Sequence, residues 1–144
     1  MVELTLFQNI INGSIPCHKV AEGTHWFAFL DIAPRRAGHT LVVPKKGVQR
    51  LSDLDETEAA ALIQGVQDVQ RRLSHQFNTT DFTVCLHDGP RAGQEVPHVH
   101  FHVLPRTEGD GGGTLHSMWK GHTKDVDQET LQKLSSALRG ENHE

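Results

Sequence analysis

The chain has 144 residues, a formal net charge of −4 and two cysteines. This length suits one domain with its own core, and no apolar stretch is long enough to cross a membrane. The acidic balance and the lack of a long basic run argue against a nucleic acid polymer as partner. Cys17 and Cys85 are far apart, and no secretory segment begins the chain, so we expect a reducing, cytoplasmic location.

The first third of the chain is predicted to form a short helix and three strands. Four apolar residues recur at helical spacing: Leu6, Phe7, Ile10 and Ile11. Gly13 offers a stop for this helix. Extended runs at residues 17–22 and 25–32 flank Gly23, which predicts a hairpin, and residues 38–44 form a third run.

A long amphipathic helix is predicted next. Asp55 and Glu58 resemble a capping box at its start, and Asn78 suits its end. One apolar stripe runs along it, formed by Leu62, Val66, Val69, Leu73 and Phe77. We expect this helix to lie across a sheet and to carry no chemistry.

Two further elements precede and follow the most informative stretch of the chain. Residues 81–87 alternate between apolar and polar side chains, which predicts a fourth strand. After a flexible glycine-rich segment at residues 109–113, Asp127 can cap a final helix and Gly140 can end it. The apolar side of this helix would be formed by Leu131, Leu134 and Leu138.

These elements indicate an α+β fold. We expect an antiparallel sheet of about five strands with helices on one face, made by one long helix and a short N-terminal helix. We interpret residues 1–144 as a single domain with a core at about residues 4–111 and a C-terminal helical tail at residues 112–144.

Three histidines alternate with three apolar residues between Pro97 and Pro105. On a strand that begins at Pro97, His98, His100 and His102 would share one face. The other face would carry Val99, Phe101 and Val103. Imidazoles cannot be cheaply buried without hydrogen-bond partners, so the histidine face suggests the floor of a cleft.

Three interpretations of the histidine face remain open at this point. It could be an ordinary half-exposed strand, or a zinc site in which a His-x-His pair supplies two ligands. It could also hold a nucleophilic histidine with orienting neighbours. The preceding loop at residues 88–96 favours the nucleophile, because its glycines and the Gln94 amide can bring N–H groups close to an anion.

The histidine pattern resembles the signature of the histidine triad (HIT) family of nucleotide hydrolases and transferases. Four further blocks resemble the family in the family's order, at residues 7–16, 29–32, 38–45 and 92–96. The resemblance spans about residues 6–111. The tail from Met118 resembles the bacterial branch, whereas the loop at residues 88–94 resembles the dinucleoside polyphosphate hydrolases.

The resemblance implies covalent catalysis by His100, which would attack the α-phosphate of a nucleotide. It implies that His98 and His102 orient His100 and stabilise charge on the phosphoryl oxygens, and that His39 is a fourth, buttressing histidine. Asp31 could only cap a turn, but the family pattern favours ribose binding. The nucleotide-binding residues implied as a set are Phe7, Ile10, Ile15, Phe29, Asp31, His87, Gly93, Gln94 and Val96.

The expected function is hydrolysis or nucleotidyl transfer on a purine (adenosine) nucleotide, for example an adenosine phosphoramidate. The alternatives are a dinucleoside polyphosphate (Ap3A/Ap4A) hydrolase and a nucleotide-binding regulator with little turnover. Many relatives bind zinc through an N-terminal Cys-x-x-Cys, but this chain has Thr5 and Gln8 there, so we expect no metal and no cofactor. The resemblance also implies a homodimer.

Three features of the chain leave residue roles open. His87 stands where many relatives carry Asn or Gln, and Glu95 stands where many carry a small hydroxyl residue. A carboxylate repels phosphate, so we expect Glu95 to point away from it or to select a leaving group. Trp119 follows the glycine-rich segment, and we expect it to cover or flank the nucleotide site.

Overall fold

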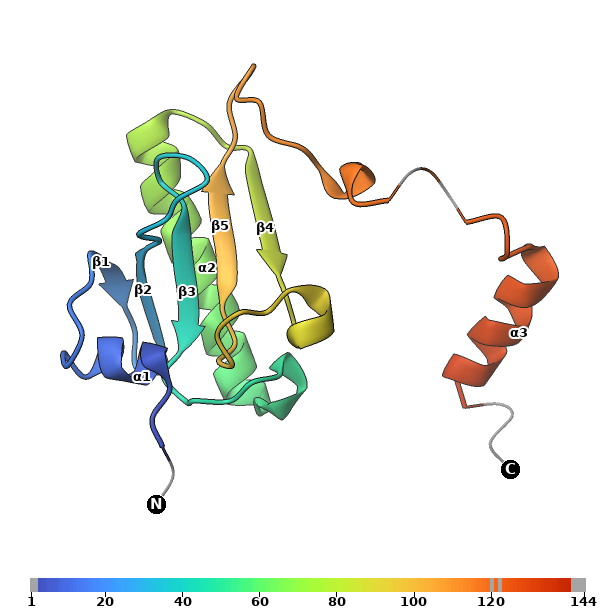
Figure 1. Ribbon diagram of the computed structural model, residues 1–144, viewed down its shortest axis with the longest axis horizontal. Coiled ribbons are helices and arrows are strands. Elements are labelled where there is room, and N and C mark those ends of the chain that lie inside the picture. The colour runs from blue at the N-terminus through green and yellow to red at the C-terminus, as the bar shows by residue number, and fades with distance from the viewer. Residues whose placement is uncertain (1–2, 120, 122, 141–144) are drawn as a thin grey trace. The chain divides into compact units, whose positions relative to one another are not determined.

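The computed structural model describes residues 3–119, 121 and 123–140 (Figure 1). The chain forms two compact units, residues 1–110 and residues 111–144. The first unit contains α1 (Leu6–Ile11), α2 (Glu56–Phe77), β1 (Lys19–Glu22), β2 (Trp26–Leu30), β3 (Thr40–Pro44), β4 (Phe82–Leu86) and β5 (Phe101–Pro105).

All five strands form one antiparallel sheet in the order β1-β2-β3-β5-β4. Strands β1 to β3 follow one another in sequence and in space. Helix α2 then carries the chain past the position of β5 to the edge strand β4, and β5 returns between β3 and β4. The α+β fold predicted from the sequence, with about five antiparallel strands, is confirmed.

Helix α2 begins and ends where its sequence predicts. The Asp55 carboxylate accepts the N–H of Glu58 at 2.8 Å, and the Glu58 carboxylate accepts the N–H of Asp55 at 3.0 Å. Asn78 ends the helix in the left-handed conformation, at φ +52°. This reciprocal cap satisfies two N–H groups that a helix start otherwise leaves unpaired.

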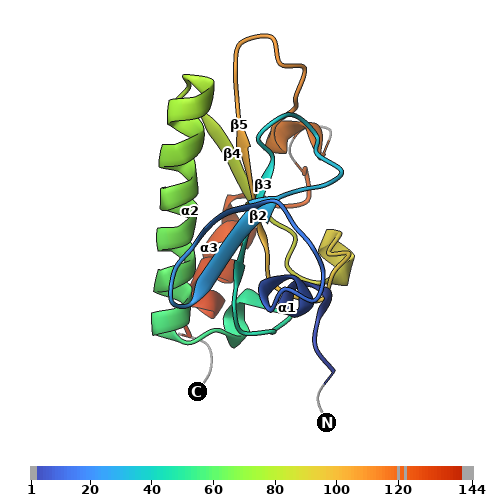
Figure 2. The same ribbon diagram turned by 90° about the vertical axis from the view of Figure 1, so that its left-hand side faces the viewer.

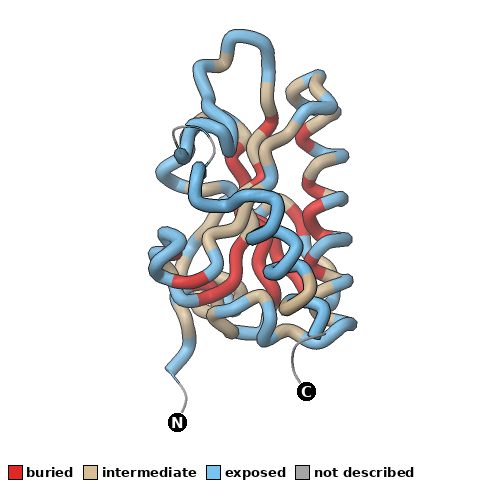
Figure 3. The backbone as a smooth tube through the Cα atoms, turned by 90° about the vertical axis from the view of Figure 1, so that its right-hand side faces the viewer, coloured by how far each residue is buried: buried red, intermediate tan, exposed pale blue. Residues whose placement is uncertain are grey.

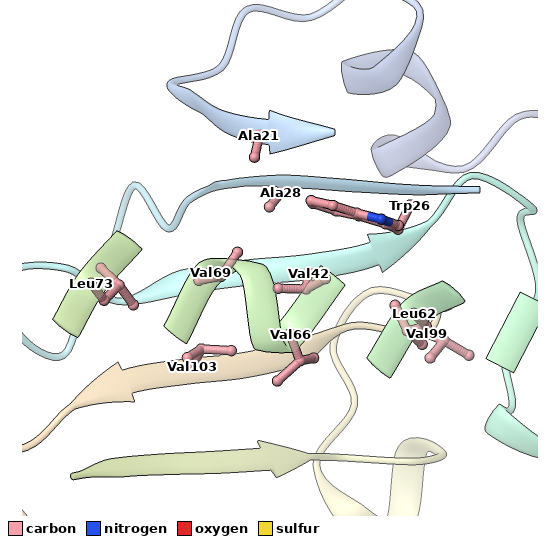
Figure 4. Close-up of a cluster of buried hydrophobic side chains, with 10 residues drawn as sticks. All are labelled: Ala21, Trp26, Ala28, Val42, Leu62, Val66, Val69, Leu73, Val99 and Val103. Carbon is pink, nitrogen blue, oxygen red and sulfur yellow. The ribbon is translucent and has the colours of Figure 1, made fainter. Parts of the chain in front are cut away.

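The apolar stripe of α2 packs on one face of the sheet and forms the main core. Figure 4 shows this cluster, whose buried members are Ala21, Trp26, Ala28, Val42, Leu62, Val66, Val69, Leu73, Val99 and Val103. The indole of Trp26 lies against Gly65, where an added Cβ would come within 2.6 Å of the ring. Figure 3 shows the buried positions gathered in the sheet and along one side of α2.

Helix α1 packs on the opposite face of the sheet, so the expectation that the helices share one face is wrong. Figure 2 shows α1 and α2 on different sides of the strands. A second core forms there from Phe7, Phe27, Phe29, Leu41 and Val43. Alternate residues of β2 and β3 therefore feed two cores, which is why both strands read as nearly continuous apolar runs. The sequence pattern of a strand buried on both faces does not say which helix covers which face.

Strand β5 begins at Phe101, four residues later than predicted. Leu41 lies opposite His102, and Cys85 lies opposite it on the other side. Pro97 and His98 precede the strand and make no ladder bonds, so Pro97 is not its first residue. The alternation of side chains nevertheless survives, since Val99 and Val103 both reach the core under α2.

The second unit contains α3 (Gln128–Leu138). Asp127 caps it by accepting the N–H of Thr130 at 2.8 Å, and Gly140 follows at φ +83°, as predicted. Its apolar residues Leu131, Leu134 and Leu138 are exposed. Among the described residues of the whole chain, no helix combines the length and apolarity that crossing a membrane requires.

Candidate active site

His98 is fully buried, and both of its ring nitrogens are bonded within the protein. Nε2 lies 2.7 Å from the carbonyl oxygen of Pro44. A carbonyl only accepts, so Nε2 carries the proton and donates it. Nδ1 of the neutral ring then accepts from the hydroxyl of Thr5 at 2.6 Å. Both ring nitrogens are thus used within the protein, which favours the orienting role expected of His98 over the stabilisation of charge on the phosphoryl oxygens.

His100 is buried but keeps one ring nitrogen unbonded. Its Nδ1 lies 2.7 Å from the carbonyl oxygen of His98, so Nδ1 carries the proton and donates it. Nε2 therefore holds a lone pair, and no residue in the described part of the chain is hydrogen-bonded to it. A neutral imidazole with a free lone pair is a nucleophile.

His39 and His102 form a directed pair between adjacent strands. The N–H of Arg35 donates to Nδ1 of His39 at 3.1 Å, so the proton of the neutral His39 ring is on Nε2. That nitrogen lies 2.8 Å from Nδ1 of His102 and donates to it. The proton of His102 is thereby placed on its own Nε2, where it can donate to a ligand.

Burial keeps this histidine cluster neutral. It lowers the pKa of His98 and of His100 from the usual value, and their proximity adds to the effect at His98. It lowers the pKa of His102 to about 4, with neighbouring imidazoles contributing. Burial also lowers the pKa of His39, although the charge of Asp31 opposes the shift. The His100 ring is therefore neutral at neutral pH, with its Nε2 unprotonated.

An aromatic wall stands beside the histidines on the α1 side of the sheet. The ring of Phe7 meets the ring of Phe29 edge-on, with centroids 5.5 Å apart. It meets the rings of His100 and His98 in the same manner at 5.1 and 5.4 Å. The partly buried apolar residues packed against this second core are Ile10, Ile11, Cys17 and Val96. Of the expected nucleotide-binding set, Phe7, Ile10, Phe29 and Val96 belong to this cluster. Ile15 is half-buried just after α1 and is not part of it.

Asp31 lies at the end of β2, beside the histidine pair. One carboxylate oxygen accepts the N–H of Ala33 at 2.9 Å. Asp31 thus caps a turn, which is one of the two roles that the sequence allows. The other oxygen lies 3.6 Å from Nε2 of His39 and remains partly exposed. It is free to accept from a ligand hydroxyl group.

His87 and Gly93 border the cluster on the other side. The ring centroid of His87 lies 5.6 Å from that of His102. Gly93 adopts φ +99°, and an added Cβ there would lie 3.5 Å from Nδ1 of His87. Glu95, in the same loop, is exposed.

Gln94 is turned toward the protein. Its side-chain nitrogen donates to the carbonyl oxygen of Gln49 at 2.8 Å, and its buried Oε1 has no hydrogen-bond partner among the described residues. An acceptor atom does not bind an anion. The side-chain amide therefore anchors the loop to the segment before α2, and its Oε1 has no hydrogen to donate to a phosphate.

Two contributors to this site are not predicted by the sequence patterns: the hydroxyl of Thr5 and the backbone N–H of Arg35. The signal for Thr5 was present, because Thr5 and Gln8 have the spacing of a capping box, which marks a helix start. No signal in the sequence places that helix start against His98, 93 positions along the chain.

One group of side chains offers the geometry of a metal site. In the described part of the chain, Asp31, His39 and His102 each offer a ligand atom, and these atoms lie within 4.8 Å of one another. Nε2 of His39 and Nδ1 of His102 already share a proton in the hydrogen bond between the two rings. A metal ion would have to displace that proton, so the arrangement fits a hydrogen-bonded cluster better.

Comparison with known proteins assigns the chain to a family. A family model described as the HIT domain matches residues 12–109. An uncharacterized HIT-like protein of Methanocaldococcus jannaschii is 42% identical over 130 residues, which cover 90% of this chain and 97% of that protein. Adenosine 5'-monophosphoramidase hnt1 of Schizosaccharomyces pombe is 36% identical over 107 residues, covering 74% of this chain and 77% of that protein.

A solved structure agrees. The crystal structure of a HIT family member from Bacillus subtilis matches with a TM-score of 0.84 at 36% identity, covering 96% of both chains. The five-stranded antiparallel sheet with its helices thus belongs to a known class of fold. This chain is a member of the HIT family, whose members are typically nucleotide hydrolases.

Proposed function

We propose that the protein hydrolyses a purine (adenosine) nucleotide at its α-phosphate through a covalent intermediate on His100. The observation that carries this proposal is the hydrogen bond from Nδ1 of His100 to the carbonyl oxygen of His98, at 2.7 Å. It fixes the proton on Nδ1 and leaves the Nε2 lone pair free for attack.

The reaction proceeds in two displacements. The Nε2 lone pair attacks phosphorus, a P–N bond forms, and the bond to the leaving group breaks with its electron pair going to that group. Water then attacks phosphorus, the P–N bond breaks, and the nucleoside monophosphate departs while Nε2 recovers its lone pair. The leaving group takes a proton from the solvent as it departs in the first step. The oxygen of water ends on the monophosphate in the second step, and a proton of that water returns to the solvent. Two easier steps replace one difficult step.

The neighbouring groups divide the remaining work. His102, with its proton on Nε2, donates to a phosphoryl oxygen as negative charge develops there. The free oxygen of Asp31 accepts from ribose hydroxyl groups, and Phe7 and Phe29 contact the base. His87 and Gly93 border the sugar and phosphate. His98 supports the site without touching the substrate.

An adenosine phosphoramidate is the proposed substrate class. Two considerations support it: the similarity to a protein named adenosine 5'-monophosphoramidase, and the resemblance of the tail to the bacterial branch. The loop at residues 88–94 favours a dinucleoside polyphosphate as the second candidate. The two substrates differ only in the leaving group, so the same histidines serve both.

A substrate panel tests this proposal. Adenosine phosphoramidates, diadenosine polyphosphates and adenylyl sulfate are compared by kcat/KM on one enzyme preparation. We expect the phosphoramidates to give the highest values. Binding of adenosine monophosphate without turnover of any panel member would instead favour a nucleotide-binding regulator.

We also propose that two copies of the chain pair as a homodimer. Helix α1 covers the β2 and β3 part of its face, whereas Leu104 of β5 and Cys85 of β4 lie on that face half-buried. A second copy would complete the coverage in an isologous arrangement. Sedimentation at micromolar concentration should show twice the 16.0 kDa chain mass, and a clean monomer would contradict the proposal.

A further inference from the structure

Thr5, the residue before α1, is hydrogen-bonded to the ring of His98, and the backbone carbonyl of His98 accepts a hydrogen bond from the ring of His100. We propose that Thr5 is a positioning residue: through His98, its hydroxyl holds the carbonyl group that fixes the proton of His100 on Nδ1. The expected effect on turnover rests on the proposed function. The placement of the protons on the two rings does not depend on it.

The Thr5 hydroxyl accepts one hydrogen bond and donates another. Its oxygen accepts the N–H of Gln8 at 3.0 Å, which caps α1. Its single proton points to Nδ1 of His98, 2.6 Å away. One small side chain thus performs two tasks, and only the second concerns the active site.

The Pro44 carbonyl fixes the proton of His98 on Nε2, and the Thr5 hydroxyl supplies the donor that this tautomer requires at Nδ1. If the proton moved to Nδ1, two lone pairs would oppose each other at Nε2 and the Pro44 carbonyl oxygen, now 2.7 Å apart. The ring is fully buried, so water cannot replace a lost partner. The Thr5 hydroxyl and the Pro44 carbonyl together are therefore compatible with only one orientation and one tautomer of the His98 ring.

The orientation of His98 matters because its own backbone is outside the sheet. Strand β5 begins only at Phe101, so strand pairing does not hold the His98 carbonyl group. Two backbone bonds flank that group: the N–H of His98 donates to the Val96 carbonyl oxygen at 2.8 Å within the same loop, and the N–H of Val99 donates to the Val48 carbonyl oxygen at 2.8 Å. The ring bonds to Thr5 and Pro44 tie this residue to α1 and to the end of β3. They keep its carbonyl oxygen 2.7 Å from Nδ1 of His100.

Three substitutions separate this role from ordinary helix capping. Thr5→Val keeps the shape of the side chain but removes both the cap and the donor to His98. Thr5→Ser keeps both. Gln8→Ala is the matched control, because it removes the other half of the capping box, the bond from the Thr5 N–H to the Gln8 side chain at 3.0 Å. It leaves the Thr5 hydroxyl in place.

The measurements are steady-state kinetics on an adenosine phosphoramidate and nitrogen-15 NMR of the histidine rings. In the unaltered protein we expect protonation on Nε2 of His98 and on Nδ1 of His100. Thr5→Val should lower kcat roughly 10- to 100-fold with little change in KM, as expected when a reacting group is misplaced. It should also change the ring signals of His98. Thr5→Ser should restore both, and Gln8→Ala should alter neither.

The proposal would be overturned by a Thr5→Val protein that keeps kcat within about twofold, a change too small for a misplaced reacting group. An equal loss in Gln8→Ala with unchanged ring signals would also overturn it, because the effect would then be one of helix stability. If Thr5→Val does not fold, the NMR spectrum of the unaltered protein still tests the proposal. Protonation of His100 on Nε2 would contradict the proposed role of the His98 carbonyl. Absence of turnover in every protein would refute the proposed function, whereas the NMR result would continue to test Thr5.

Discussion

His39, the residue before β3, and His102 of β5 are joined by a hydrogen bond from Nε2 of His39 to Nδ1 of His102, 2.8 Å long. Its direction is set from outside the pair, because the N–H of Arg35 occupies Nδ1 of His39. The backbone of the segment between β2 and β3 therefore determines which ring nitrogen of His102 carries the proton that can be donated to a phosphate.

Replacing His39 by Leu should leave His102 free to take either tautomer. We expect kcat on an adenosine phosphoramidate to fall roughly 10- to 100-fold, because part of the population then presents a lone pair to phosphate. Nitrogen-15 NMR should report mixed protonation of His102. His39→Gln, which retains an N–H donor, is the matched control and should lose less. Equal activity of the Leu variant and the unaltered protein would contradict the buttressing role.

Replacing His100 by Ala should abolish turnover while leaving nucleotide binding largely intact. The proposed ribose and base contacts lie at Asp31, Phe7 and Phe29, away from the removed ring. Loss of a nucleophile costs several orders of magnitude in kcat, with residual catalysis from positioning alone. Titration calorimetry with adenosine monophosphate should show binding in both proteins.

A covalent adduct should be detectable in the unaltered enzyme. Rapid quenching with labelled substrate should trap an acid-labile, base-stable nucleotidyl group, and mass spectrometry should place it on His100. An adduct on another histidine would refute the assignment, as would a His100→Ala enzyme that keeps more than a few per cent of kcat, far above residual catalysis.

The protein should lose stability as the pH falls from about 6.5 to about 4. Burial lowers the pKa of His102 from 6.5 to about 4, so over this interval the unfolded chain binds a proton that the folded chain excludes. The pKa values of His39, His98 and His100 are lowered too, which adds to the same trend. Urea unfolding at several pH values measures the slope. His102→Gln should reduce the slope, and an unchanged slope in that variant would contradict the burial argument.

Protein purified without added metal should contain no stoichiometric zinc. The chain has Thr5 and Gln8 where the zinc-binding relatives have cysteines, and the Thr5 hydroxyl is bonded to His98. Elemental analysis measures the zinc content per chain. One zinc ion per chain would contradict this prediction and would favour the interpretation of the histidines as metal ligands, with Asp31, His39 and His102 as the candidate site.

Deleting residues 112–144 should change substrate preference more than stability. Residues 1–110 form a compact unit with both apolar cores, so their unfolding free energy should change little. Trp119 is exposed, as a docking side chain would be, and we expect its loss to change the preference between phosphoramidate and dinucleoside polyphosphate by roughly tenfold, about 1.4 kcal/mol. Unchanged preference with lost stability would show that the tail serves the fold instead.

The sequence by itself determined most of the helices and strands and predicted which histidine is the nucleophile. The caps of α2 and α3 follow from local chemistry, since Asp55 and Asp127 each bond an N–H three residues away. The alternation around His100 likewise places apolar side chains opposite the histidines wherever the chain is extended. These features depend on residues that are only a few positions apart, so they can be predicted from the sequence.

Only the tertiary structure decided how the histidines are protonated and which of them can meet a ligand. Thr5 and His98 are 93 positions apart, and His39 and His102 are 63 apart. A hydrogen bond depends on distances of about 3 Å and on the direction of a single proton. No periodicity encodes such a contact between distant segments. Packing of α1 against one face of the sheet and pairing of β3 with β5 brought these groups together, and thereby left one lone pair free, on Nε2 of His100.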